Sequence, residues 1–139
     1  MKLKDFDFRI WNNNSKTYEA GSIIESLGFI TSVFNQLTYE KPTIDYEIKL
    51  WTGYFDKNGN KIYENDILEY EPLEELYHIK RDNTYKMFKI EIFSKNFNNK
   101  IYKRKAEPDI SFLKVFKSEK NMKVIGNIHE NADLLVVKE

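Results

Sequence analysis

The side chains best suited to chemistry lie between residues 80 and 105, where basic and aromatic residues are interleaved. Nine basic and two acidic residues give this stretch a net charge of +7. Small β-domains hold single-stranded nucleic acid with basic side chains along the phosphates and aromatic rings stacked on the bases. The segment therefore predicts a nucleic-acid interface, with Tyr85, Phe88, Phe93, Phe97 and Tyr102 as the candidate stacking rings. Its candidate binding residues are Lys80, Arg81, Lys86, Lys89, Lys95, Lys100, Lys103, Arg104 and Lys105.

The same stretch also fits an ordinary strand. Phe88 shares the apolar side of an alternating run with Ile90 and Ile92, which favours a place in the core. Lysines along strand edges protect them from aggregation. Arginine, which makes bidentate phosphate contacts, supplies only three of the 22 basic residues. We therefore treat nucleic-acid binding as the alternative function.

A second candidate group is acidic. Residues 40–75 have a net charge of −6, with carboxylates gathered at Glu64, Asp66, Glu69, Glu71, Glu74 and Glu75. Paired carboxylates can catalyse hydrolysis or hold Mg²⁺. Asp66, however, belongs to a turn sequence, and the glutamates flank Pro72 as a solvated segment would. The pattern favours a solvated acidic face.

No pattern in the chain indicates a catalytic or metal centre. The two histidines, His78 and His129, are far apart and lack ligand-spaced neighbours, and there is no cysteine. The sequence contains no phosphate-binding glycine loop and no nucleophile elbow. We predict no catalytic residues, no metal and no cofactor, and hence a protein that is not an enzyme.

Length and composition predict a single domain, residues 1–139, that is mostly β. A chain of 139 residues has the length of one domain, and its 15% aromatic content favours strands. The absence of cysteine fits a reducing cytoplasm. No run approaches the roughly 20 apolar residues that span a bilayer, so we expect no membrane partner. No secretory signal is visible at the N-terminus.

Alternation and turn residues predict most of the elements. Residues 7–11 and 16–19 read as a hairpin, and residues 43–50 as a half-buried strand with Ile44, Tyr46, Ile48 and Leu50 on one side. Residues 73–79 favour one helical turn. Further strands are expected at residues 67–70, 88–92, 110–116 and 122–128, with a bulge at Gly126.

Residues 22–37 fit either a helix or a strand. A helical stripe and a capping box formed by Ser22 and Glu25 favour a helix. Gly28 and the β-branched residues that follow it favour a strand. The apolar stripe comprises Ile23, Leu27, Ile30, Phe34 and Leu37.

Two tight turns punctuate residues 50–68. Asp56 can bond back to the amides of its turn, and Gly59 supplies the positive φ that the turn requires. Residues 64–66 predict a second turn in which Asn65 tolerates the left-handed conformation.

These turns carry a resemblance to a known family. Residues 52–53, 56–59, 62–64 and 66–67 match in register the central motif of the YopX family of small phage and prophage proteins. A second block matches at residues 124–128, 130–131 and 134–135, and residues 8–11 look like the family's usual opening. Asn65 stands where the family prefers glycine, His129 replaces a common tyrosine, and Ala132 a common proline.

The resemblance implies a mostly β fold, with a small SH3-like barrel elaborated by hairpins and at most one or two short helices. It implies no defined activity and carries no functional residues, because the matched positions read as turn and core residues. It also implies a phage or prophage protein in the cytoplasm of a bacterial host.

Three functional hypotheses follow. The leading one is a non-enzymatic accessory protein that binds a host protein, in a regulatory or anti-defence role. The alternative is nucleic-acid binding by residues 80–105. A further alternative is sequestration of a small nucleotide-like ligand. The many aromatic residues are also compatible with a homo-oligomer.

Overall fold

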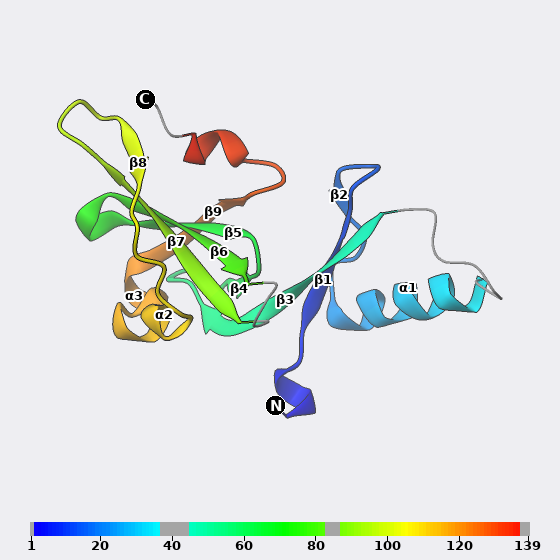
Figure 1. Cartoon of the computed structure of the whole chain (residues 1–139). Coiled ribbons are helices and arrows are strands. Elements are labelled where there is room, and N and C mark those ends of the chain that lie inside the picture. Colours follow the sequence, from blue (N-terminus) through cyan, green and yellow to red (C-terminus); the bar gives the residue numbers. More distant parts are fainter. Residues whose placement is uncertain (1, 37–44, 83–86, 137–139) are drawn as a thin grey trace. The chain divides into compact units, whose positions relative to one another are not determined.

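The computed structural model describes residues 2–36, 45–82 and 87–136, and it divides into two compact units, Met1–Trp51 and Thr52–Glu139 (Figure 1). Strand β3 (Tyr46–Phe55) runs across the boundary between them. The prediction of a mostly β chain is confirmed: the strands form two antiparallel sheets, one curled into a half-barrel. No helix in the described part of the chain is long and apolar enough to cross a membrane.

The first unit is a small sheet with one long helix. After a 3₁₀ turn η1 (Leu3–Asp5), strand β1 (Phe8–Asn12) pairs with β2 (Thr17–Tyr18) and with the first half of β3. The predicted hairpin is confirmed by the Trp11–Tyr18 pair. Residues 43 and 44 of the predicted strand lie outside the described residues.

The expected alternation along β3 is wrong in one respect. Lys49 is buried at 4% exposure, whereas Ile48 is 49% exposed. The Lys49 ammonium reaches the Glu47 carboxylate at 3.1 Å, and this ion pair lets a basic side chain occupy a buried position.

The ambiguous segment is a helix, α1 (Ile23–Gln36). Its start has the expected capping residues: Ser22 Oγ accepts a hydrogen bond from the Glu25 amide at 3.2 Å. Glu25 Oε2 in turn accepts one from the Gly21 amide at 3.0 Å. These bonds satisfy amides that a helix N-terminus leaves without partners. Leu37, the last member of the predicted stripe, lies outside the described residues.

The second unit contains a five-stranded antiparallel sheet with the order β8-β7-β6-β5-β9. Strand β4 (Lys61–Tyr63), beside the end of β3, precedes it. The five strands of this sheet are β5 (Asp66–Tyr70), β6 (Glu75–Arg81), β7 (Phe88–Lys95), β8 (Ile101–Lys103) and β9 (Met122–Asn127). The short helices are η2 (Glu71–Leu73), α2 (Ser111–Val115), α3 (Ser118–Asn121) and η3 (Ala132–Leu135).

Two sequence predictions in this unit are wrong. Residues 73–79 form no helical turn, because β6 begins at Glu75 and pairs with β7. Residues 110–116 form no strand, because α2 places Leu113 in the core with Ile79 and Ile90. Asp109 forms an Asx turn just before this helix, because its Oδ1 accepts a hydrogen bond from the Ser111 amide at 2.9 Å.

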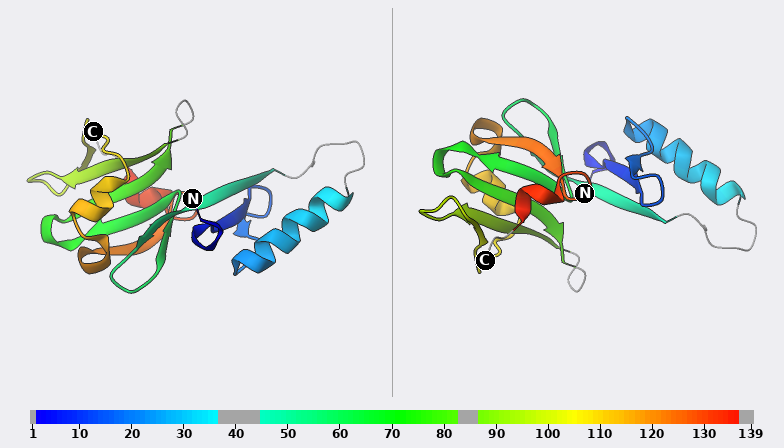
Figure 2. Two further views of the ribbon diagram at one scale, coloured as in Figure 1. Left: turned by 90° about the horizontal axis from the view of Figure 1, so that it is seen from below. Right: turned by 90° about the horizontal axis from the view of Figure 1, so that it is seen from above.

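Each face of the five-stranded sheet carries its own apolar cluster. The main core includes Tyr77, Ile79 and Leu113, so α2 covers this face (Figure 2). Residues next to these core positions along the strands point to the other face; among them, Ile67 and Phe93 form a second cluster with Leu135 of η3. This second face carries the candidate site described below.

Candidate binding site

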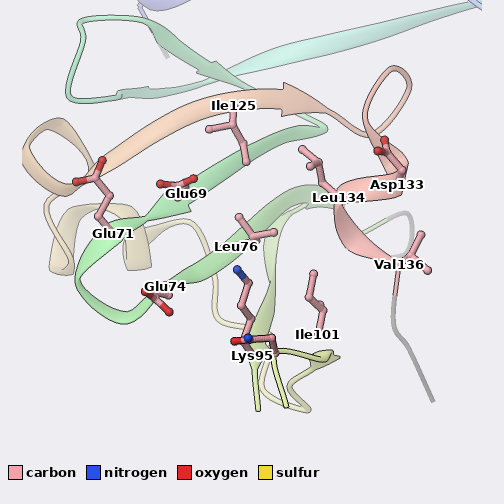
Figure 3. A pocket seen from close by; sticks show the side chains of 11 residues that line it. Glu69, Glu71, Glu74, Leu76, Lys95, Ile101, Ile125, Asp133, Leu134 and Val136 are labelled. Atoms are coloured by element: carbon pink, nitrogen blue, oxygen red, sulfur yellow. The ribbon is translucent and has the colours of Figure 1, made fainter. Parts of the chain in front are cut away.

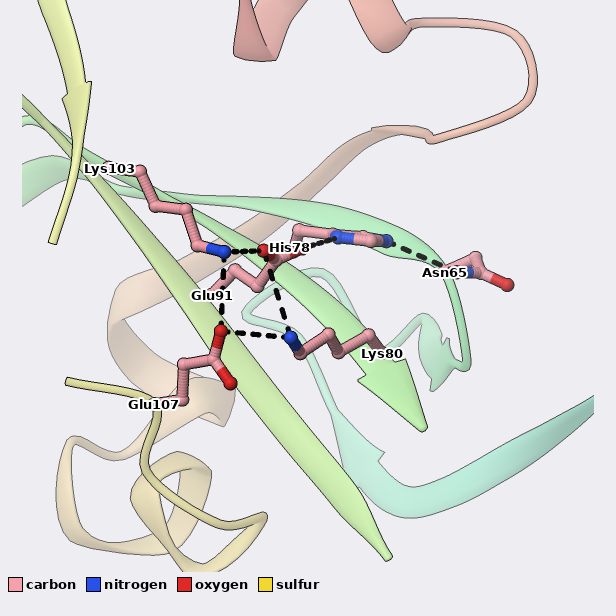
Figure 4. A network of polar contacts seen from close by, with 6 residues as sticks. All are labelled: Asn65, His78, Lys80, Glu91, Lys103 and Glu107. Carbon is pink, nitrogen blue, oxygen red and sulfur yellow. Dashed lines mark hydrogen bonds and ion pairs between the residues drawn. The ribbon is translucent and has the colours of Figure 1, made fainter. Parts of the chain in front are cut away.

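Some basic side chains of residues 80–105 form ion pairs within the protein, and others are exposed to solvent. Lys80 and Lys103 turn to the same face of the sheet and meet the carboxylates of Glu91 and Glu107 (Figure 4). Lys80 Nζ lies 2.8 Å from Glu107 Oε1, and Lys103 Nζ lies 3.2 Å from the same oxygen. Lys103 also forms an ion pair with Glu91. These two partly exposed cations are therefore paired with carboxylates of their own chain.

The next residue, Arg104, pairs with a different carboxylate. Arg104 Nη1 lies 3.1 Å from Oε2 of Glu75, which is 6% exposed and also accepts hydrogen bonds from Ser94 Oγ at 2.6 Å and Tyr77 Oη at 3.1 Å. Successive strand residues point to opposite faces, so Lys103 and Arg104 do not line one groove.

The remaining members of the predicted nucleic-acid site are scattered. Arg81 Nε lies 3.8 Å from Glu64, and Lys89 is half-buried opposite Asp109. Lys95, Lys100 and Lys105 are exposed and make no ion pair within the described part of the chain. Lys86 and the aromatic Tyr85 lie outside the described residues.

The candidate stacking rings divide in the same way. Phe88 packs against the main core and Phe93 is buried, as the ordinary-strand interpretation predicts. Phe97 is fully exposed in the turn between β7 and β8, and Tyr102 is 44% exposed. Among the candidate rings in the described part of the chain, only Phe97 and Tyr102 are open to a base, and the nucleic-acid assignment stays a prediction.

His78 lies beside these ion pairs, and both of its ring nitrogens are occupied. Nδ1 lies 2.7 Å from Glu91 Oε1, and Nε2 lies 3.1 Å from Asn65 Nδ2. An amide nitrogen only donates, so Nε2 accepts and Nδ1–H donates, which describes a neutral imidazole. Burial lowers the pKa of His78, although Glu91 acts in the opposite direction. The ring joins the turn at Asn65 to β7 and has no nitrogen left for proton transfer.

The predicted solvated acidic face is wrong for three of its six members. Glu64, Asp66 and Glu75 are buried. Asp66 Oδ2 accepts a hydrogen bond from the Tyr63 amide at 2.8 Å and so closes the turn before β5. The other three carboxylates, Glu69, Glu71 and Glu74, line a pocket.

This pocket has a volume of about 640 Å³ and lies on the sheet face opposite α2 (Figure 3). The aliphatic side chains that line it extend from the second apolar cluster: Leu76, Ile101, Ile125 and Leu134 all pack against that cluster. Each of the strands β5 to β9 and the turn η3 contributes at least one residue to the lining. The full lining is Glu69, Glu71, Glu74, Leu76, Lys95, Asn99, Ile101, Ile125, Asp133, Leu134 and Val136.

Charge around the pocket is predominantly negative. Four carboxylates, those of Glu69, Glu71, Glu74 and Asp133, stand against the single ammonium of Lys95. Glu71 also pairs with Lys57, and this hydrogen-bonded ion pair lowers the pKa of the Glu71 carboxyl. All four carboxylates are on partly or fully exposed residues at the rim.

Among the described residues, the lining of the pocket contains no histidine, serine, threonine or tyrosine. Nor does the described part of the chain hold a group of three or more acidic and histidine side chains arranged for a metal ion. An apolar floor with carboxylates around it suits a ligand that is both aliphatic and cationic.

Sequence reasoning identified the glutamates but not the pocket. The available signal was the second set of apolar residues, out of phase with the core: Leu76 precedes core residue Tyr77, and Ile125 follows the partly buried Val124. The convergence of β8 and η3 on this face depends on pairings that no local pattern contains.

Comparison with models of protein families gives a match over nearly the whole chain. The family model described as "YopX protein" matches residues 7–136, which is nearly the whole chain. No curated protein matches the chain significantly.

Proposed function

This chain belongs to the YopX family, and we propose that it is a non-enzymatic accessory protein that acts by binding another protein. The observation that carries the proposal is the pocket of about 640 Å³ with an aliphatic floor and an acidic rim. Its volume lies within the range of roughly 300–1,000 Å³ typical of ligand sites.

The lining chemistry specifies the segment that the pocket would take. An aliphatic side chain of the partner packs on Leu76, Ile101 and Ile125. Flanking lysines or arginines pair with Glu69 and Glu74 at the rim. The partner is therefore a protein with an exposed segment in which one aliphatic residue lies between basic ones.

The cellular setting belongs to the same proposal. The motif blocks at residues 8–11, 52–67 and 124–135 resemble phage and prophage proteins, and the absence of cysteine fits a reducing compartment. We place the protein in the cytoplasm of a bacterial host, where its target is a host protein. The curled half-barrel suits the SH3-like expectation, because small barrels of this class commonly carry binding sites on one face.

The test is selection from a displayed library of random peptides on the purified chain. We expect enrichment of peptides with an aliphatic residue flanked by lysine or arginine. The double variant Glu69→Lys, Glu74→Lys should lose this enrichment. Glu119→Lys, the same charge reversal on the exposed helix α3, should keep it.

Two results would contradict the proposal. One is the absence of any enriched basic–aliphatic motif on the wild-type chain. The other is equal enrichment on the Glu69→Lys, Glu74→Lys variant, which would place the binding surface elsewhere.

Nucleic-acid binding is retained as a second candidate because of one observation. Phe97 is fully exposed in the β7–β8 turn, between the exposed lysines Lys95 and Lys100. If single-stranded nucleic acid binds, the affinity should fall steeply with salt, and Phe97→Ala should weaken it. Lys103→Ala should have a smaller effect than Lys100→Ala, since Lys103 is committed to Glu91 and Glu107. Salt-independent affinity would exclude this mode.

A further inference from the structure

Helix α1 of the first unit has two apolar faces, and the sheet covers only one. The inner face contacts the sheet: the Phe29 ring meets Tyr46 edge-on with centroids 5.2 Å apart, and Ser26 is 1% exposed. The outer face carries Ile24, Leu27 and Phe34 at exposures of 79%, 48% and 63%. Their spacing of three and seven residues puts them in one stripe.

An apolar cavity adjoins the C-terminal end of this stripe. It has a volume of about 180 Å³ and opens between α1 and the strands β1 and β3. Phe34 belongs both to its wall and to the outer stripe, and Ile48 on β3 is half-exposed beside it. A cavity of about 150 Å³ accommodates a benzene ring, so this one has room for a large aliphatic or aromatic side chain. Its full lining is Ile10, Phe29, Ile30, Val33, Phe34, Tyr46 and Ile48.

Gly28 is exposed one turn after Ile24, at the edge of the outer stripe. A Cβ built at this position would meet nothing within 4 Å. Glycine in a helix interior is unfavourable relative to alanine. A glycine on an exposed apolar stripe allows a second backbone to approach closely, as small residues do where helices cross.

We propose that the outer face of α1 is the interface of a homodimer, in which two copies of the helix pack antiparallel about a two-fold axis at Gly28. Ile24 and Phe34 are ten residues apart, or about 15 Å along a helix. In an antiparallel pair centred at Gly28, Ile24 of one copy meets Phe34 and the cavity of the other, Leu27 lies beside its counterpart, and the reverse contact forms by symmetry.

Charge favours a second copy as the occupant. Glu25 is the only charged residue of α1, and its carboxylate is bonded to the Gly21 amide. A neutral apolar stripe is complementary to itself. A charged partner would find no group of opposite sign along the stripe. A single-helix interface is small, so the dimer is concentration-dependent.

The experiment is sedimentation equilibrium of the full chain over a dilution series from micromolar to near-millimolar concentration. We expect a monomer–dimer equilibrium. Leu27→Glu buries a charge at the interface and should weaken the dimer by about tenfold or more. Gly28→Leu should have the same effect through steric exclusion. Val115→Glu, the matched change on a 70% exposed residue of α2, should leave association unchanged.

Circular dichroism separates association from folding. Because Gly28 has open space around it, Gly28→Leu should retain the helical signal of the wild type. The proposal is overturned if the wild type stays monomeric throughout the series. It is equally overturned if Leu27→Glu and Gly28→Leu associate as the wild type does. Neither result bears on the pocket, which lies in the other unit.

Discussion

Replacing Asp56 by alanine should destabilise the fold strongly, although this residue lies in a surface turn. Its carboxylate accepts hydrogen bonds from the amides of Asn58 at 2.9 Å, Asn60 at 2.8 Å and Val124 at 3.0 Å. The Asn60 side chain adds a fourth at 3.2 Å. Asp56 is 2% exposed and joins the turn after β3 to the strand β9, 68 residues further along the chain.

The size of the effect follows from what each donor loses. The amides of Asn58 and Asn60 belong to exposed residues and regain water, so their loss resembles removal of a helix cap, about 1–2 kcal/mol. The Val124 amide is part-buried, and leaving it without a partner costs about 1–3 kcal/mol. The total of about 3 kcal/mol is a large fraction of the 5–15 kcal/mol typical of a domain.

The effect should depend on pH. Burial by itself raises the pKa of the Asp56 carboxyl, but the four hydrogen bonds outweigh burial and lower the pKa below its ordinary value. A carboxyl with a lowered folded-state pKa stabilises the fold fully above its unfolded pKa, near 3.9, and this contribution is lost as the pH falls from that value through the lower folded-state pKa. The difference between wild type and variant should therefore shrink below about pH 4.

Urea denaturation of wild type, Asp56→Ala and Asp56→Asn measures this directly. The asparagine retains one acceptor oxygen and should lose about half as much free energy of unfolding. Asp133→Ala, an exposed residue, is the control and should stay within about 0.5 kcal/mol of wild type. The reasoning is refuted if Asp56→Ala unfolds at the wild-type urea concentration, or if its deficit is the same at pH 3 and pH 7.

Two further predictions concern β9 and the buried histidine. Gly126→Ala places a Cβ 2.2 Å from Asn131 Oδ1 and 2.9 Å from Asn131 Cβ, so it should lower the free energy of unfolding by about 1–3 kcal/mol, measured by the same titration. Gly53→Ala is the comparison for backbone strain without a clash, because Gly53 has a φ of 90° and open space around its Cβ position. For His78, a lowered folded-state pKa means that the unfolded chain binds the proton more tightly, so stability rises with pH up to about 6.5. This slope, measured by denaturation between pH 5 and 7, should disappear in His78→Gln and persist in His129→Gln; a slope unchanged in His78→Gln would assign it to another group.

Turns and caps were predictable because their chemistry is local. Gly59 has the expected positive φ of 79°, and Asn65 has a φ of 71°. The Asn65 side chain has an additional role here, since it donates to His78. That contact joins residues 13 apart and has no local signature.

Long-range pairing explains what the sequence pattern missed. Residues 110–116 have apolar positions that suit a strand and a helix equally, and the packing of Leu113 into the main core decides for α2. The local sequence around Glu75 predicts a solvated residue. In the structure Glu75 is buried and pairs with Arg104, which lies 29 residues later in the chain. The pocket was missed for the same reason: its floor combines residues of β6, β8 and β9 with η3.

The register shift in β9 places one residue of the pocket floor outside the regular pairing of the sheet. Leu68 pairs with Val124 and Ile67 with Gly126, so Ile125 is a single extra residue between two regular pairs. A chain without Ile125 could keep every one of these pairs and retain Met122 and Val124 against the main core. Deletion of Ile125 would therefore remove one aliphatic side chain from the pocket floor and leave the pairing of the sheet intact.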